Sequence, residues 1–282
     1  MVRLNRLVAP LIASALLLGA TGAAAAADTA DVRVLHASPD APAVDVYLDD
    51  AIVDALTNVP FGTISDYLQI PAGDHNVKVY ATGTTADPVI DADVTVAAGK
   101  AYTVAATGAL ADITAQVLED EPAPIASAAK VRVVHFSADA PAVDIATAGS
   151  GVDEAVVKAL AYPDATGYLE LPGGTYDLEV RLAGETTVAL PLADVTIEDG
   201  RAYSVFAVGS AASPAVGGNA LQAVVAVDGT AGAAAGTAPP TDTIAGTGAA
   251  PSSSSTLVTA LVLGVAAFAV AFAATTRRIR QS

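Results

Sequence analysis

The sequence predicts an all-β protein built from two tandem antiparallel β-sandwich domains of the Ig-like kind. Three observations support this prediction. The stretch VRVLHASPDAPAVD at 32–45 returns as VRVVHFSADAPAVD at 131–144, with eleven of fourteen positions identical. Short segments of β composition follow each copy, and turn residues separate them at a spacing of roughly ten residues. The 282-residue chain also has room for two domains that each bury a core.

The first unit is predicted to span residues 30–120. Its apolar residues alternate with polar ones, as in Val77-Lys78-Val79, which is the pattern of a half-buried strand. Only the segment 49–58 has the character of a short helix. The predicted strands are 32–37, 43–49, 63–70, 75–81, 89–96, 101–107 and 113–119.

The second unit is predicted to span residues 130–228 and repeats the first beyond the opening motif. Residues 67–73 correspond to 168–174, and 99–104 correspond to 200–205. The offset grows from 99 to 101 residues, which predicts an insertion in a surface loop near 149–151. The intervening stretch 121–129 contains two prolines and is predicted to be a semi-rigid spacer. Two copies are too few for a solenoid, so we expect separate beads.

The N-terminal residues 1–27 have the pattern of a secretory signal peptide. Arg3 and Arg6 precede an apolar stretch, and small residues including Ala25 and Ala27 form a cleavage site for a signal peptidase. We expect cleavage after Ala27.

The C-terminal segments have the pattern of a stalk and an anchor. Residues 229–255 are rich in Ala, Gly, Thr, Ser and Pro, a composition that predicts a flexible stalk. The helix predicted at 256–274 contains eighteen consecutive uncharged and mostly apolar residues, which would span about 27 Å of a membrane. The basic tail 275–282 is expected to stay in the cytoplasm, so both units would lie on the extracellular face.

A five-residue motif precedes this helix: Ile244, Ala245, Gly246, Thr247 and Gly248. Together with the spacer, helix and basic tail, it resembles the sorting signal of Gram-positive wall-anchored proteins, with Ile244 in place of the usual leucine. The resemblance implies that a sortase cuts after Thr247 and joins this residue to peptidoglycan. The alternative is a permanent membrane anchor behind an ordinary stalk.

Charge and cysteine content narrow the function classes. Thirty acidic residues lie between Asp28 and Asp242 with only eight basic ones, so this region carries a formal net charge of −22. Such a surface repels phosphate backbones, which argues against nucleic acid as a partner. It suits a soluble extracellular protein, or one that collects divalent cations. The chain has no cysteine, so disulfides and thiolate sites are excluded.

The repeated motif contains the residues that could carry chemistry: His36, Ser38, Asp40 and Asp45, with His135, Ser137, Asp139 and Asp144 in the second copy. We reject a catalytic triad, because no strained nucleophile turn is present, and we expect no enzyme and no cofactor. Calcium held by the aspartates is the alternative, since hard oxygen ligands suit it. We favour a structural role, in which the histidine bonds a loop carboxylate or carbonyl and fixes the turn.

Two pairs of tyrosines are predicted to be structural. Tyr102 and Tyr203 each begin an apolar strand after a Gly-(Lys/Arg)-Ala turn, a placement similar to the tyrosine corner of sandwich folds. Tyr67 and Tyr168 are expected at the rim of the core.

The repeated motifs resemble those of domain of unknown function family 4397 (DUF4397). They are His-x-Ser-x-Asp-Ala-Pro-Ala-Val-Asp, Tyr-Leu-x-(Ile/Leu)-Pro-x-Gly and Gly-(Lys/Arg)-Ala-Tyr-(Thr/Ser)-Val, and they cover roughly residues 31–228. The resemblance implies extracellular β-sandwich modules without an established activity. We therefore expect a non-catalytic surface protein with an adhesion or envelope-structural role. The alternative is a module that binds a divalent cation or a wall glycan, with a hydrolase third.

Overall fold

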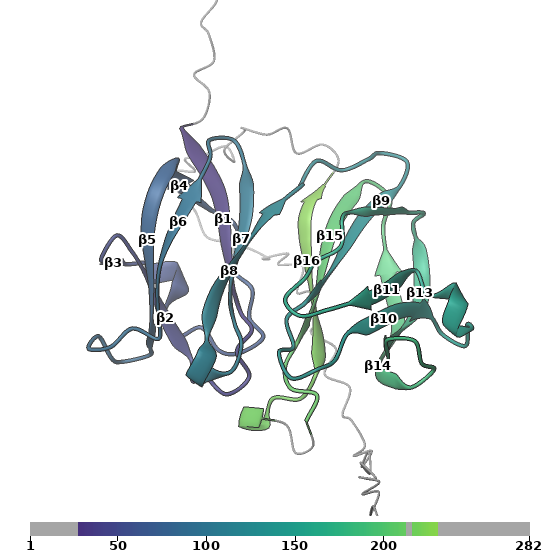
Figure 1. The fold of residues 1–282 in the computed structure, drawn as a ribbon. Coiled ribbons are helices and arrows are strands. Elements are labelled where there is room, and N and C mark those ends of the chain that lie inside the picture. Colours follow the sequence, from purple (N-terminus) through teal and green to yellow (C-terminus); the bar gives the residue numbers. More distant parts are fainter. Residues whose placement is uncertain (1–27, 213–215, 231–282) are drawn as a thin grey trace, which may run out of the picture.

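The structure is a computed structural model that describes residues 28–212 and 216–230, which form two β-sandwiches (Figure 1). The predicted signal peptide, sorting motif and C-terminal helix lie outside the described residues. Within the described ranges no helix is long and apolar enough to cross a membrane. Every strand of the described residues pairs within a sheet of this range, and the apolar clusters draw their members from it. We therefore expect residues 28–230 to fold on their own.

The first sandwich consists of two four-stranded sheets, with strand orders β4-β1-β7-β8 and β3-β2-β5-β6. Six of its strands overlap closely with predicted segments, whereas β4 shares only residues 68–70 with the predicted segment 63–70, and a further two-residue strand, β3, lies inside the segment 49–58. That segment also contains a single 3₁₀ turn, η1, in place of the predicted short helix. The elements are β1 (Thr29–His36), β2 (Val44–Leu48), β3 (Ala51–Ile52), η1 (Asp54–Leu56), β4 (Leu68–Pro71), β5 (Gly73–Ala81), β6 (Ile90–Val96), β7 (Ala101–Thr107), η2 (Leu110–Asp112) and β8 (Thr114–Asp120).

The second sandwich repeats this topology, with strand orders β12-β9-β15-β16 and β11-β10-β13-β14. The predicted insertion near 149–151 lies in the loop after β10, where Gly149 has a φ of 76° that suits a tight turn. The elements are β9 (Ala129–His135), β10 (Val143–Thr147), η3 (Val152–Glu154), β11 (Val157–Leu160), β12 (Leu169–Leu171), β13 (Gly174–Leu182), β14 (Val188–Ile197), β15 (Arg201–Val208), η4 (Val216–Gly218) and β16 (Gln222–Thr230).

One strand pair in each sandwich is parallel, which corrects the prediction of purely antiparallel sheets. β1 runs parallel to β7, and β9 runs parallel to β15. Parallel neighbours need a long crossover connection. Here the strands of the opposite sheet, β2, β3, β5 and β6 in the first unit, lie along the chain between the two parallel strands. The crossover thus consists of β2 to β6, an arrangement that local sequence patterns do not reveal.

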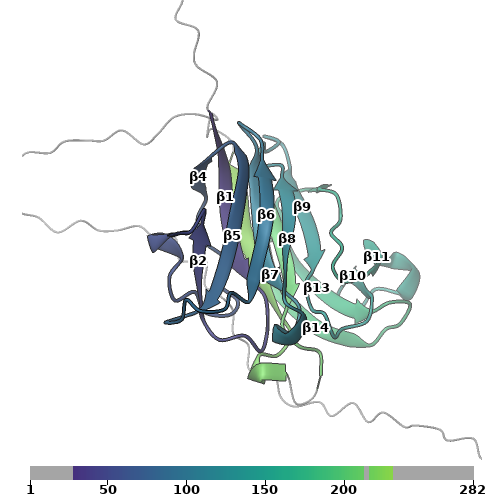
Figure 2. The same cartoon turned by 60° about the vertical axis from the view of Figure 1, so that its left-hand side comes forward.

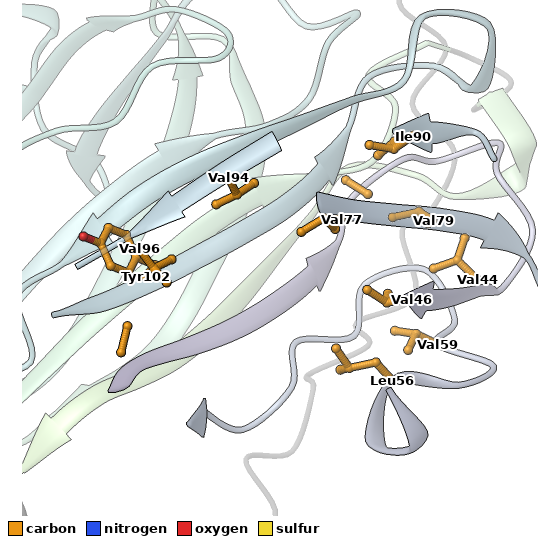
Figure 3. Close-up of a cluster of buried hydrophobic side chains, with 12 residues drawn as sticks. Val44, Val46, Leu56, Val59, Val77, Val79, Ile90, Val94, Val96 and Tyr102 are labelled. Carbon is orange, nitrogen blue, oxygen red and sulfur yellow. The ribbon is translucent and has the colours of Figure 1, made fainter. Parts of the chain in front are cut away.

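The core of the first sandwich is a single cluster of apolar side chains from both sheets (Figure 3). The alternation predicted for β5 is observed, because Val77 and Val79 are buried while Lys78 is partly exposed. The cluster continues through Val94 and Val96 on β6 to Tyr102 on β7. The cross-strand burial of these branched side chains stabilises the sandwich without disulfides.

The two sandwiches share an apolar core between them, which corrects the expectation of separate beads. Leu35 and Ala105 of the first unit pack with Val134, Phe136 and Phe206 of the second. The sheet that contains β7 and β8 faces the sheet that contains β15 and β16 (Figures 1 and 2). All seven residues of β7 are buried, because one face of the strand packs inside its own sandwich and the other packs against its neighbour.

The stretch between the units also contacts the second sandwich, so it is more than a spacer. The backbone N–H of Glu121 donates to the hydroxyl of Tyr168 at 3.3 Å, and the carboxylate of Glu121 lies 3.6 Å from the ammonium of Lys130. The chain thus passes from one sandwich to the next along a packed surface.

Candidate functional site

The histidines of the repeated motif are buried and hold the loop that follows them. His36 ends β1 with none of its surface exposed, and its Nε2 donates to the carbonyl oxygen of Pro42 at 3.0 Å. His135 makes the same bond to Pro141 at 3.1 Å. Burial lowers the pKa of both imidazoles, so both are neutral near pH 7. Each ring thus connects the end of its strand to the loop that follows it.

The serines of the motif do not bond to the histidines through their hydroxyls. Ser137 Oγ donates to the carbonyl oxygen of Gly209 at 2.7 Å, and Ser38 Oγ lies 3.5 Å from a carboxylate oxygen of Asp40. A serine nucleophile needs a base that accepts its proton. Nε2 of each histidine is turned to a proline carbonyl. Nδ1 of His135 accepts from the backbone N–H of Ser137 at 3.3 Å, and Nδ1 of His36 is buried without a hydrogen-bond partner, so neither described serine hydroxyl is bonded to a histidine.

The aspartates of the motif accept hydrogen bonds from the backbone of neighbouring loops. Asp45 accepts from the N–H groups of Asn58 and Gly83 at 2.7 and 3.2 Å, and Asp144 accepts from those of Ala159 and Gly184 at 2.7 and 2.9 Å. The bond from Asn58 lowers the pKa of Asp45. These carboxylates hold two loops at the end of each sandwich.

Asp40 and Asp139, which precede Asp45 and Asp144 in the repeated motif, also accept hydrogen bonds from other loops. Asp40 accepts from the N–H of Leu110 at 2.7 Å, and Asp139 accepts from Ser210 Oγ at 2.5 Å and from the N–H of Ala211 at 2.9 Å. Burial opposes ionisation of Asp139, but these hydrogen bonds outweigh it and lower its pKa. A calcium ion at the motif would have to displace these donors. Among the described residues, no group of three or more His, Cys, Asp or Glu side chains has the arrangement of a metal site.

The tyrosine corners are present in both units. The hydroxyl of Tyr102 accepts a hydrogen bond from the N–H of Ala97, and that of Tyr203 accepts one from the N–H of Glu198, each at 3.2 Å. Both donors lie five residues upstream, as expected for this motif.

The interface between the sandwiches contains a reciprocal pair of buried salt bridges that the sequence analysis missed. Arg33 on β1 pairs with Asp228 on β16, and Arg132 on β9 pairs with Asp120 on β8. Each pair therefore joins the first sandwich to the second. The two arginine side chains are 2% and 4% exposed and both carboxylates are fully buried, so solvent screens neither pair.

Matching hydroxyl groups complete both salt bridges. Arg33 Nε donates to Thr103 Oγ1 at 2.8 Å, and Arg132 Nε donates to Ser204 Oγ at 2.7 Å. Tyr67 donates to Asp120 at 2.5 Å and Tyr168 to Asp228 at 2.6 Å, while the tyrosine rings lie under the guanidinium groups of Arg33 and Arg132. Burial and the nearby carboxylates raise the pKa of both tyrosines. These tyrosines therefore belong to the interface, not only to the rim of the core.

A signal for this network exists in the sequence. Arg33 and Arg132 both stand at the second position of a Val-Arg-Val segment, in a chain with few basic residues. An arginine in the same place in two apolar strands indicates a buried partner. The aspartates were harder to find, because Asp120 and Asp228 are separated by 108 residues and fall outside the repeated motifs.

The comparisons with known proteins show the family. The model of the family described as "Domain of unknown function (DUF4397)" matches residues 30–146 and 150–239. The first match continues beyond the first sandwich into β10, and the second begins at the loop after it. No curated protein matches the chain.

Solved structures show a distant likeness. The TIE protein of Bacillus anthracis is 12% identical over 65% of this chain and 34% of its own, with a TM-score of 0.21, so the match spans about a third of that protein. CBMbc, of family CBM26, from Eubacterium rectale Amy13K was solved with maltoheptaose. It is 10% identical over 64% of this chain and 92% of its own, with a TM-score of 0.23. A candidate cell adhesion protein from Bacteroides eggerthii is 13% identical over 71% and 96%, with a TM-score of 0.18. Likeness at this level transfers no ligand or partner to this chain.

Proposed function

Since the chain belongs to the DUF4397 family, for which no function is established, we propose that it is a non-catalytic cell-surface protein with an adhesion or envelope-structural role. The observation that carries the proposal is the use of the repeated polar side chains. The histidines, the aspartates and Ser137 all form hydrogen bonds with backbone groups of loops and thereby hold those loops in place. Because the repeated side chains fix loops, their arrangement supports a role in which the protein displays a rigid surface.

The joined sandwiches support the same role. Two buried salt bridges and a shared apolar core bind the units into one head, so a load on one unit is transmitted to the other. A net charge of −22 on the region from Asp28 to Asp242 keeps such a head soluble. The stalk is expected to raise it by about 30 Å if it behaves as a random coil.

We further propose that the head is exported by the signal peptide and joined to peptidoglycan at Thr247 by a sortase. To test this, the envelope is digested with a muralytic enzyme and the C-terminal peptide is read by mass spectrometry. A peptide that ends at Thr247 and carries a wall fragment supports the proposal. An intact end at Ser282 in a detergent extract contradicts wall attachment, and a full-length cytoplasmic protein contradicts surface display.

The role itself is tested with a deletion strain complemented by variants. We expect deletion to weaken cell–surface attachment or envelope integrity, and the double variant Ser38→Ala with Ser137→Ala to restore it once the folded head is displayed at the wild-type level. An enzyme that used these hydroxyls would not be restored. A displayed, folded double variant without function would therefore contradict the non-catalytic proposal.

A further inference from the structure

The core of the second sandwich contains a cavity of about 120 Å³, against about 40 Å³ in the first. Apart from the core that the two sandwiches share, the buried apolar residues of the second sandwich form two separate clusters, while those of the first form one. Side chains from both clusters line the larger cavity, including Ile145 and Val180 from one and Val131 and Ile197 from the other. The cavity thus divides a core that is continuous in the first repeat.

One cause is a substitution on the second strand of each unit. Leu48 on β2 lies opposite Val77, and Thr147 on β10 lies opposite Leu178 in the equivalent register. Leu48 packs against the first core, whereas Thr147 is exposed at the edge of the cavity. The shorter, polar side chain leaves space that leucine fills in the first sandwich.

A second cause is a shorter connection at the same end. The backbone N–H of Val53 donates to the carbonyl oxygen of Val46 in the first unit, and that of Val156 donates to the carbonyl oxygen of Ile145 in the second. In both units the chain then returns to pair with an equivalent residue of the second strand: Val59 pairs with Val44, and Leu160 pairs with Val143. Val59 lies six residues after Val53, whereas Leu160 lies four residues after Val156. The two extra residues of the first unit allow η1 to place Leu56 over the core, where it is 3% exposed. The second unit has no 3₁₀ turn between these points.

The cavity is apolar and reaches the surface. Val94 on β6 is 6% exposed, but its counterpart Val195 on β14 is only partly buried and lines the cavity. Two tyrosines line the cavity as well, but their hydroxyls form hydrogen bonds with the backbone. The hydroxyl of Tyr176 donates to the carbonyl oxygen of Pro172, and that of Tyr203 accepts from the backbone N–H of Glu198. A ligand inside would therefore meet hydrocarbon and little else.

We propose that the second sandwich binds an uncharged hydrocarbon group between its sheets. An engineered apolar cavity of about 150 Å³ stays dry and accepts benzene, so this cavity has the size for a short alkyl chain or a small ring. Twenty-nine acidic residues against eight basic ones between 28 and 230 disfavour a carboxylate at the mouth. The inference is independent of where the protein is displayed.

The test uses residues 28–230 labelled with ¹³C at valine and leucine methyl groups, with 1-hexanol and hexanoate as probes. These probes share one chain and differ in charge. We expect 1-hexanol to shift the methyl resonances of Leu190 and Val195 in a saturable way, and to leave those of Val77 and Val94 unchanged. Hexanoate should bind at least tenfold more weakly.

Two filling variants from opposite sheets and one control complete the design. Thr147→Leu restores the leucine of the first repeat, and Ala223→Leu enters the cavity from β16; each should weaken hexanol binding at least tenfold. Thr114→Leu, at an exposed position on β8, should leave binding unchanged. Unshifted cavity methyls, equal shifts in both sandwiches, equal hexanoate affinity or full binding by both filling variants would each overturn the proposal.

Discussion

Removal of Arg33 tests the interface most sharply. The change Arg33→Met keeps much of the apolar length of the side chain but leaves the carboxylate of Asp228 fully buried without its positive partner. Breaking one partner of a buried pair typically costs about 3–5 kcal/mol of unfolding free energy. For a domain of this size, such a loss lowers the melting temperature by about 6–20 °C.

A double variant separates the contribution of the ion pair to stability from that of the Arg33 side chain alone. Arg33→Met combined with Asp228→Asn removes both charges, while the amide oxygen of the asparagine can still accept from the Tyr168 hydroxyl and from Ser204 Oγ, which both donate to Asp228 Oδ2. We therefore expect the double variant to recover much of the lost stability in urea unfolding of residues 28–230. Lys100→Met is the control, because its salt bridge with Glu119 is about half exposed on both sides and should contribute little. A small effect of Arg33→Met, or a double variant no more stable than the sum of the single changes, would refute the reasoning.

Three further predictions concern the loops and corners. His36→Leu leaves the carbonyl of Pro42 without its donor and should cost about 1–3 kcal/mol in urea unfolding, equally with and without calcium; a calcium-dependent cost would favour the cation-binding alternative. Tyr102→Phe removes the acceptor for the N–H of Ala97 and should cost about 1 kcal/mol, so an unchanged unfolding midpoint would argue against the tyrosine corner. Because burial lowers the pKa of His36 and His135, the unfolded chain binds more protons below about pH 6.5, and stability should fall as the pH drops from there. His75 Nδ1 donates to the Asp49 carboxylate at 2.7 Å, which raises the pKa of His75. The stabilisation by protonated His75 is therefore complete below about pH 6.5 and is lost as the pH rises through the raised pKa, so His75→Gln should remove this loss above pH 6.5 and leave the fall at lower pH in place; an unchanged profile above pH 6.5 would contradict the assignment.

The local features of the fold were predictable because their causes are local. Alternation around Val77 placed β5, and the turn before Tyr102 placed its corner. The structural reading of His36 followed from the turn chemistry of the residues after it. In each case the interacting groups lie within a few residues of one another, or within one repeated motif.

The contacts between the repeats were not predictable in the same way. Arg33 and Asp228 are separated by 195 residues, and nothing near either residue specifies the other. The parallel pairing of β1 with β7 likewise depends on the strands between them. The larger cavity depends on differences between the repeats, such as Leu48 against Thr147, which motif identity conceals. Such features follow from tertiary packing.

Calorimetric unfolding of residues 28–230 tests most directly the claim that the repeats form one body. If the shared core and the reciprocal salt bridges join the sandwiches, the protein should unfold in a single transition, with equal calorimetric and van't Hoff enthalpies. Two resolved transitions, or a calorimetric enthalpy near twice the van't Hoff value, would show that each sandwich unfolds on its own and would contradict the account.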